Sequence, residues 1–68
     1  MADPASTLAE LSTLVTRLEE LSKRVTDVAE QYSGTPDSRI ASDLFSAERA
    51  LHGAHRSLLR AAEQLKIS

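Results

Sequence analysis

The sequence predicts an all-α protein, an antiparallel two-helix hairpin that dimerises into a four-helix bundle. Three observations lead to this prediction. Apolar residues recur with a helical seven-residue period in both halves of the chain, one break containing Gly and Pro separates the halves, and 68 residues are too few to bury a large core alone. We expect a single domain over residues 1–68, with helices at about 4–33 and 36–67 and a turn at about 33–36.

The first half of the chain carries an uninterrupted heptad repeat. Its two main core positions hold Leu11, Leu14, Leu18, Leu21, Val25, Val28 and Tyr32. Leu8, Val15 and Ala29 widen this stripe to the breadth typical of a bundle helix. The opposite side is polar and is expected to face solvent; it carries Glu19, Lys23, Thr26, Asp27 and Glu30.

The second half repeats the pattern with three rows of residues. The first is a leucine row, Leu44, Leu51, Leu58 and Leu65. The expected second core row is Ile40, Ala47, Ala54 and Ala61, because alternating large and small side chains lets neighbouring helices approach closely. The third row, Phe45, His52 and Leu59, lies beside the leucines and is expected to face a second chain.

Capping residues mark the ends of both helices. Asp3 and Pro4 form one start signal for the first helix, and Thr7 with Glu10 forms another, of the capping-box type. Gly34 suits the left-handed residue that ends a helix, and Thr35 followed by Pro36 suits the start of the next one. A connection this short makes the two helices antiparallel neighbours.

One hairpin seam leaves much of each apolar arc uncovered, so the chain is expected to associate with itself, as a homodimer or a higher oligomer, or with another helical protein. The residues expected at helix–helix interfaces are Leu11, Leu14, Leu18, Leu21, Val25, Val28, Leu44, Phe45, Leu51, Leu58, Leu59 and Leu65.

Composition excludes several classes of function. The absence of cysteine excludes disulfides and thiolate metal sites and suits a cytoplasmic location. The net charge of −2 gives no electrostatic reason to expect a nucleic-acid partner. No apolar run approaches the length of about 18 residues that spans a membrane, and no signal peptide is visible, so neither a membrane nor export is expected.

No nucleophile–base pair or phosphate-binding loop is recognisable, so we expect a non-enzyme without a cofactor. Three residues nevertheless form a candidate metal set on one face of the second helix, namely Glu48, His52 and His55. They follow a Glu-x-x-x-His step, whereas di-metal carboxylate bundles use Glu-x-x-His. A half-exposed histidine pair without metal is therefore the expected state, and a metal-binding bundle is an alternative function.

Two further features suggest alternative functions. The turn Tyr32-Ser33-Gly34 resembles the Trp-x-Gly turn of the WXG100 family of small secreted helical hairpins, with Tyr in place of Trp, and this resemblance implies secretion. Arg49, Arg56 and Arg60 form a basic strip, expected to be a solvated face in which Arg60 pairs with Glu63.

The leading expectation is a cytoplasmic assembly or adaptor protein acting through helix–helix contacts, with an antitoxin-like or regulatory partner as the main alternative.

Overall fold

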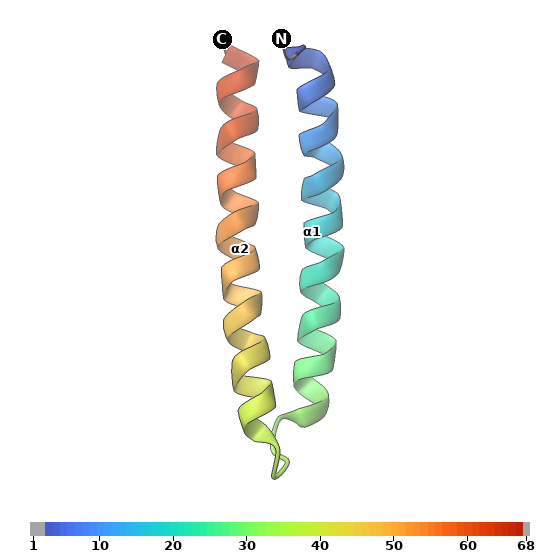
Figure 1. Cartoon of the computed structure of the whole chain (residues 1–68), viewed down its shortest axis with the longest axis vertical. Coiled ribbons are helices and arrows are strands. Elements are labelled where there is room, and N and C mark those ends of the chain that lie inside the picture. The colour runs from blue at the N-terminus through green and yellow to red at the C-terminus, as the bar shows by residue number, and fades with distance from the viewer. Residues whose placement is uncertain (1–2, 68) are drawn as a thin grey trace.

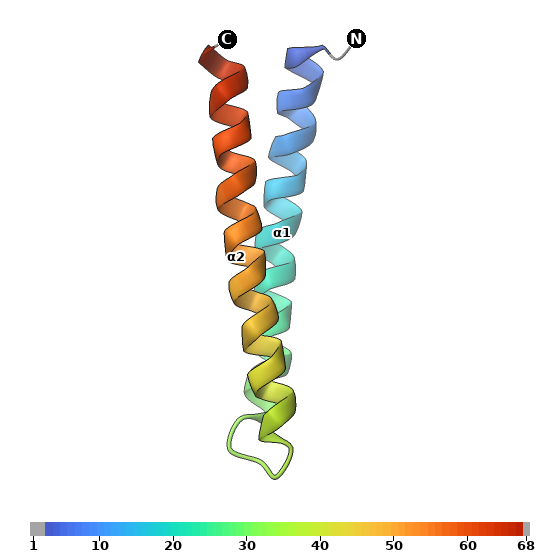
Figure 2. The same ribbon diagram turned by 60° about the vertical axis from the view of Figure 1, so that its left-hand side comes forward.

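The computed structural model describes residues 3–67 and contains two long helices. Helix α1 spans Pro4–Tyr32 and helix α2 spans Ser38–Ile67, and residues 33–37 connect them. The helices lie side by side in opposite directions, so that both ends of the chain are at one end of the molecule and the turn is at the other (Figures 1 and 2). The predicted all-α hairpin is therefore confirmed.

The helix ends follow the capping signals closely. The Asp3 carboxylate accepts hydrogen bonds from the Ala5 amide at 3.2 Å and from the Ser6 hydroxyl at 3.0 Å, with Pro4 in the first turn. Of the two predicted starts, the chain therefore uses the one at Asp3. At the other end, the Ser33 amide donates to the carbonyl of Ala29 at 3.1 Å.

The turn needs the glycine, because Gly34 has a φ of 77°, in the left-handed region. The Thr35 hydroxyl accepts from the Asp37 amide at 3.2 Å and donates to the Tyr32 carbonyl at 2.6 Å. Helix α2 begins at Ser38, two residues later than expected, since the Ser38 amide bonds to the Thr35 carbonyl, 3.1 Å away, in a tight turn that contains Pro36. The connection is correspondingly longer than predicted.

The contact between the helices, which we call the seam, is made by residues at alternating spacings of three and four. On α1 these are Leu8, Leu11, Val15, Leu18, Ser22, Val25, Ala29 and Tyr32. On α2 they are Ala41, Leu44, Glu48, Leu51, His55, Leu58, Ala62 and Leu65. Of the described residues only Ala29 and Ala41 are fully buried, and the rest of the seam is half-buried. Two helices alone therefore form a seam but no enclosed core.

The seam corrects the second core row expected on α2. Ala47, Ala54 and Ala61 are exposed, and Ile40 is 44% exposed. The row that faces α1 in their place is Ala41, Glu48, His55 and Ala62. Both rows flank the leucine row, so either can complete a seam of alternating spacing. We expected the more apolar row to face α1, but in the hairpin the more polar row does.

Candidate functional site

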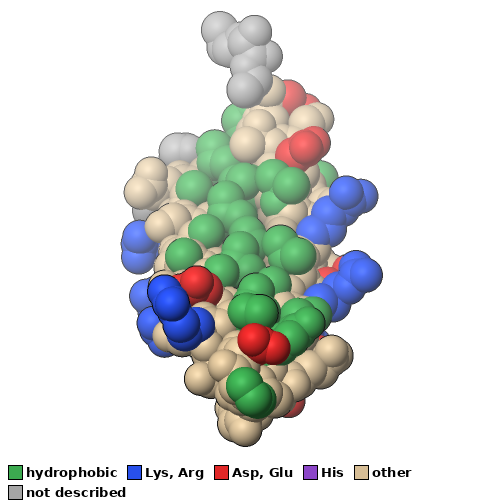
Figure 3. All heavy atoms as spheres, turned by 60° about the horizontal axis from the view of Figure 1, so that its bottom comes forward, with side chains coloured by type: hydrophobic (Ala, Val, Ile, Leu, Met, Phe, Trp, Pro, Cys, Tyr) green, Lys and Arg blue, Asp and Glu red, His purple; other side chains and the backbone are tan. Residues whose placement is uncertain are grey.

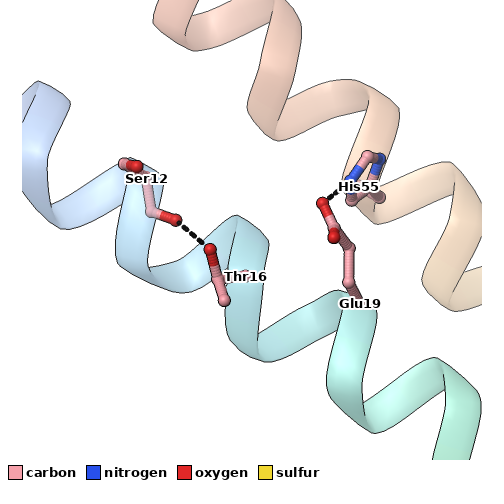
Figure 4. Close-up of polar contacts among 4 residues, drawn as sticks. All are labelled: Ser12, Thr16, Glu19 and His55. Carbon is pink, nitrogen blue, oxygen red and sulfur yellow. Dashed lines mark hydrogen bonds and ion pairs between the residues drawn. The ribbon is translucent and has the colours of Figure 1, made fainter.

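One side of the seam is polar, and its side chains bond across the two helices. The Thr26 hydroxyl donates to Glu48 Oε2 at 2.6 Å. Two helical turns further along α2, His55 Nε2 lies 3.1 Å from Glu19 Oε1, and this contact joins the helices in Figure 4. The Thr16 hydroxyl in the same view bonds only within α1, to the Ser12 carbonyl at 3.1 Å. We call the surface that contains the two cross-helix contacts the polar side.

The polar side is hollowed into an open groove between the helices. Its lining residues are Glu19, Ser22, Lys23, Thr26, Asp27, Glu48, His52, His55 and Arg56. Glu19 and Thr26 were expected on the face exposed to solvent. Glu19 is exposed there and meets His55, whereas Thr26 is half-buried and bonds across the seam. The signal that was available is their spacing of seven, which matches the spacing between Glu48 and His55 on the antiparallel helix.

The candidate metal residues lie close together but direct their polar atoms to different partners. His52 Nε2 is 3.4 Å from Glu48 Oε1, whereas His55 faces Glu19 on the other helix. The second oxygen of Glu48 is occupied by the Thr26 hydroxyl. Over the described residues, no three His, Cys, Asp or Glu side chains are grouped so as to hold a metal ion. The prediction that the purified protein carries no metal remains to be tested.

The opposite side of the hairpin carries two uncovered apolar rows. Helix α1 contributes Leu14, Leu21 and Val28, which are 40%, 48% and 42% exposed. Helix α2 contributes the exposed residues Ile40, Ala47, Ala54 and Ala61. We call these seven residues the apolar face. Figure 3 looks onto it and shows hydrophobic side chains gathered in one band along the molecule, with Lys and Arg on both flanks.

The two rows share one side of the hairpin because of where they stand around each helix. On α1, the row of Leu14 and Leu21 borders the seam on the edge away from Glu19. On α2, the row of Ala47 and Ala54 borders the seam on the edge away from His52. Glu19 and His52 line the same groove, so the two apolar rows lie together on the other side.

The hairpin exposes more surface than a compact chain of its mass. Its accessible surface is 5224 Å² for 7.4 kDa, roughly 1,000 Å² above the ~4,200 Å² typical of a folded monomer of that mass. Its radius of gyration is 15.7 Å, against about 11 Å for a compact domain of 68 residues. The excess is close to the ~800 Å² that each partner buries in a standard protein interface.

The expected third row of α2 borders the polar side. Phe45 is half-buried beside the seam, Leu59 is 45% exposed, and His52 stands between them in the row. Helix α1 therefore covers part of this row and leaves exposed the row of Ile40, Ala47, Ala54 and Ala61, which we call the alanine row. The sequence pattern suggested the reverse. Whether Phe45 and Leu59 contact a second chain is still a prediction.

The basic strip is exposed, as expected, but its local partners differ. Arg49, Arg56 and Arg60 all lie on the surface. Arg60 donates to the Ser57 hydroxyl at 3.1 Å, and Glu63 pairs with Lys66 at 3.6 Å. The expected pair between Arg60 and Glu63 is therefore replaced by two other local contacts.

Comparison with protein-family models, with curated proteins and with solved structures finds no match to this chain. The resemblance of the turn at Tyr32 to secreted hairpins consequently depends on those turn residues alone. Neither helix contains, within the described residues, a segment both long and apolar enough to cross a membrane.

Proposed function

We propose that this chain is a small, non-enzymatic assembly protein of the cytoplasm, which acts by binding helices through its apolar face. The observation that carries the proposal is the row Leu14, Leu21 and Val28, which places a large apolar side chain on the exposed side of α1 every seven residues. The single hairpin leaves much of their surface open to solvent. Contiguous exposed apolar surface of this kind is typical of interaction sites.

The geometry of the row favours a helical partner. A spacing of seven residues corresponds to two helical turns, or about 10.5 Å, which is the repeat at which a second helix packed nearly parallel presents its own side chains. The apolar face holds no charged side chain among its seven residues, so a partner helix meets no unpaired charge there. The absence of cysteine is compatible with a reducing compartment.

The proposal is tested by replacing the large row with a polar residue that forms helices well. We expect the triple variant Leu14→Gln, Leu21→Gln, Val28→Gln to lose self-association, measured as mass by multi-angle light scattering across a range of concentrations. Because the three side chains are partly exposed in the hairpin and glutamine is a good helix former of similar length, the helix should be retained in the variant. We also expect the melting temperature of the wild type, but not of the variant, to rise with protein concentration.

A matched control row exists on the outer surface of the same helix. Thr13, Glu20 and Asp27 are also spaced by seven and exposed, and their triple replacement by Gln should leave mass and melting behaviour as in the wild type. If the apolar-face variant retains the mass and melting temperature of the wild type, the apolar face is not the interaction surface and the proposal is wrong.

A further inference from the structure

We infer that the apolar face binds a second copy of this chain in one orientation, with both turns at the same end of the dimer and α1 of each copy packed on α2 of the other. This inference rests on the proposed function, and it names the partner and the register. In this arrangement the row Leu14, Leu21 and Val28 of one copy lies on the alanine row of its partner.

The first step is the register within one hairpin. The contacts Glu19–His55 and Thr26–Glu48 place residues of α1 and α2 at the same level along the molecule, and the two contacts agree in register. Continuing that register, Leu21 stands one residue from the level of Ala54, or about 1.5 Å along the axis. The same offset relates Leu14 to Ala61 and Val28 to Ala47, so each large residue is level with a small one.

The second step is the choice of symmetry axis. Homodimers use a twofold axis, and two directions can bring a pair of apolar faces together. An axis along the hairpin keeps every residue at the same level in both copies. It packs the row Leu14, Leu21 and Val28 of each copy on the alanine row of the other. An axis across the hairpin places the turns at opposite ends and sets large on large and small on small.

Packing favours the axis along the hairpin. The distance between helix axes depends on the side chains at the contact and ranges over about 8–10 Å. Large side chains on large ones in one helix–helix contact, and alanine on alanine in the other, would require two different interaxial distances in one interface. A large side chain on alanine at every layer gives both contacts the same interaxial distance, so that neither is overpacked or contains a cavity.

Charge at the edge of the apolar face favours the same axis. Arg17 and Arg24 follow Leu14 and Leu21 by three residues, so they border the face on α1. With the turns at opposite ends, α1 would pack antiparallel on its copy and bring these four arginines together near the middle of the interface. With the turns at the same end, they are level with Ser57 and Ala50 of the other copy, which are exposed and uncharged.

The area available fits one further copy. The excess accessible surface of roughly 1,000 Å² per chain is close to what one partner contributes to a standard dimer interface. A partner related by a twofold axis contacts the alanine row with one of its helices and the row Leu14, Leu21 and Val28 with the other. A dimer therefore covers both rows.

Spin labels measure the orientation directly. The chain has no cysteine, so Asp37→Cys introduces one thiol next to the turn, at an exposed position. We expect two labels within about 25 Å, or two helix diameters, of each other by pulsed electron resonance. A separation near the 51 Å length of the hairpin would overturn the inference. A label at Glu20→Cys, near mid-helix, lies close to the level of its copy in either orientation, so a separation well below the 51 Å length of the hairpin confirms that a dimer is being measured.

A side-chain exchange tests the register. Leu21→Ala leaves a cavity and Ala54→Leu overfills a layer, so each alone should lower the melting temperature at a fixed protein concentration. If Leu21 of one copy packs on Ala54 of the other, the double variant should regain most of that loss. Additive losses in the double variant would contradict the register.

These outcomes separate the two proposals. A triple glutamine variant that loses assembly, together with turn labels about 50 Å apart, preserves the apolar face as the interaction surface and overturns the orientation. A wild-type chain that remains monomeric at every concentration overturns the second copy as partner. An unchanged glutamine variant overturns both.

Discussion

The two sides of the hairpin are built on the same seven-residue period, yet on one side polar side chains bond across the two helices, and on the other apolar side chains are left uncovered. On the polar side, Thr26 bonds to Glu48 and Glu19 meets His55. On the apolar face, Leu14, Leu21 and Val28 have no comparable partner row of large side chains on α2. Within one chain, the polar side adds hydrogen bonds beside an apolar seam, whereas the apolar face stays uncovered.

This division has a physical reason. A polar group at a seam is stable when a specific partner reaches it, and the antiparallel helix supplies that partner at a fixed level. Apolar side chains need no specific atom, only removal from water, which another chain provides equally well. Hydrogen bonds across the two helices therefore favour one register of the hairpin, whereas burial of exposed apolar surface would favour association with another chain.

The largest expected effect comes from a charge placed in the seam between the two sides. We expect Leu18→Asp or Leu58→Asp to destabilise the protein by about 3–5 kcal/mol, because each side chain is half-buried against the other helix and a carboxylate there would lose much of its hydration. The far-ultraviolet circular dichroism signal of helix should fall towards that of an unfolded chain. Ser46→Asp, exposed on the outer surface of α2, is the control and should retain the helical signal.

The comparison between the sides is sharpest in a matched pair of leucines. Leu21 on the apolar face and Leu59 on the edge of the polar side are 48% and 45% exposed in the hairpin. We expect Leu21→Gln to raise the dimer dissociation constant about thirtyfold, since the side chain is covered twice across a twofold interface. Leu59→Gln should change it by less than about twofold.

Analytical ultracentrifugation at several concentrations gives both constants. Equal effects of the two substitutions would mean that the row of Phe45 and Leu59 also belongs to the interface, as the sequence pattern first suggested, and the division between the two sides would no longer hold.

A smaller effect is expected from the hydrogen bond that links the helices on the polar side. Thr26→Val keeps the shape of the side chain and removes the donor to Glu48, so the free energy of unfolding should fall by about 1 kcal/mol in urea titrations. Thr16→Val removes a bond that stays within α1 and should change stability by less than about 0.5 kcal/mol. The same loss in both variants would indicate that the cross-helix bond adds nothing beyond a local one.

The smallest effect is expected from the histidines. His52→Ala combined with His55→Ala should change the free energy of unfolding by less than about 1 kcal/mol, since each contact with a carboxylate has one largely exposed member, His52 in one and Glu19 in the other. Elemental analysis of the purified wild type should find no stoichiometric metal. A bound metal that is present in the wild type and absent from the double variant would show that the polar groove is a metal site.

The sequence alone was enough to predict the two helices, their antiparallel arrangement and the ends that Asp3 and Gly34 define. These features depend on neighbours along the chain: a capping carboxylate reaches an amide two residues away, and a left-handed glycine ends a helix whatever packs against it. The apolar residues of α1 were likewise visible from their period, and so was the need for more covering surface than one hairpin offers.

Only the tertiary structure decided which row of α2 turns towards α1. The leucine row has a neighbour on each side, the row of Ala47 and the row of Glu48, and local periodicity serves both equally well. The choice depends on what stands at the same level on the other helix, where Thr26 and Glu19 supply hydrogen-bonding partners to Glu48 and His55. Such a pairing joins residues that are 22 and 36 positions apart. The matching spacing of seven within each helix permits the pairing but does not by itself say which residues meet.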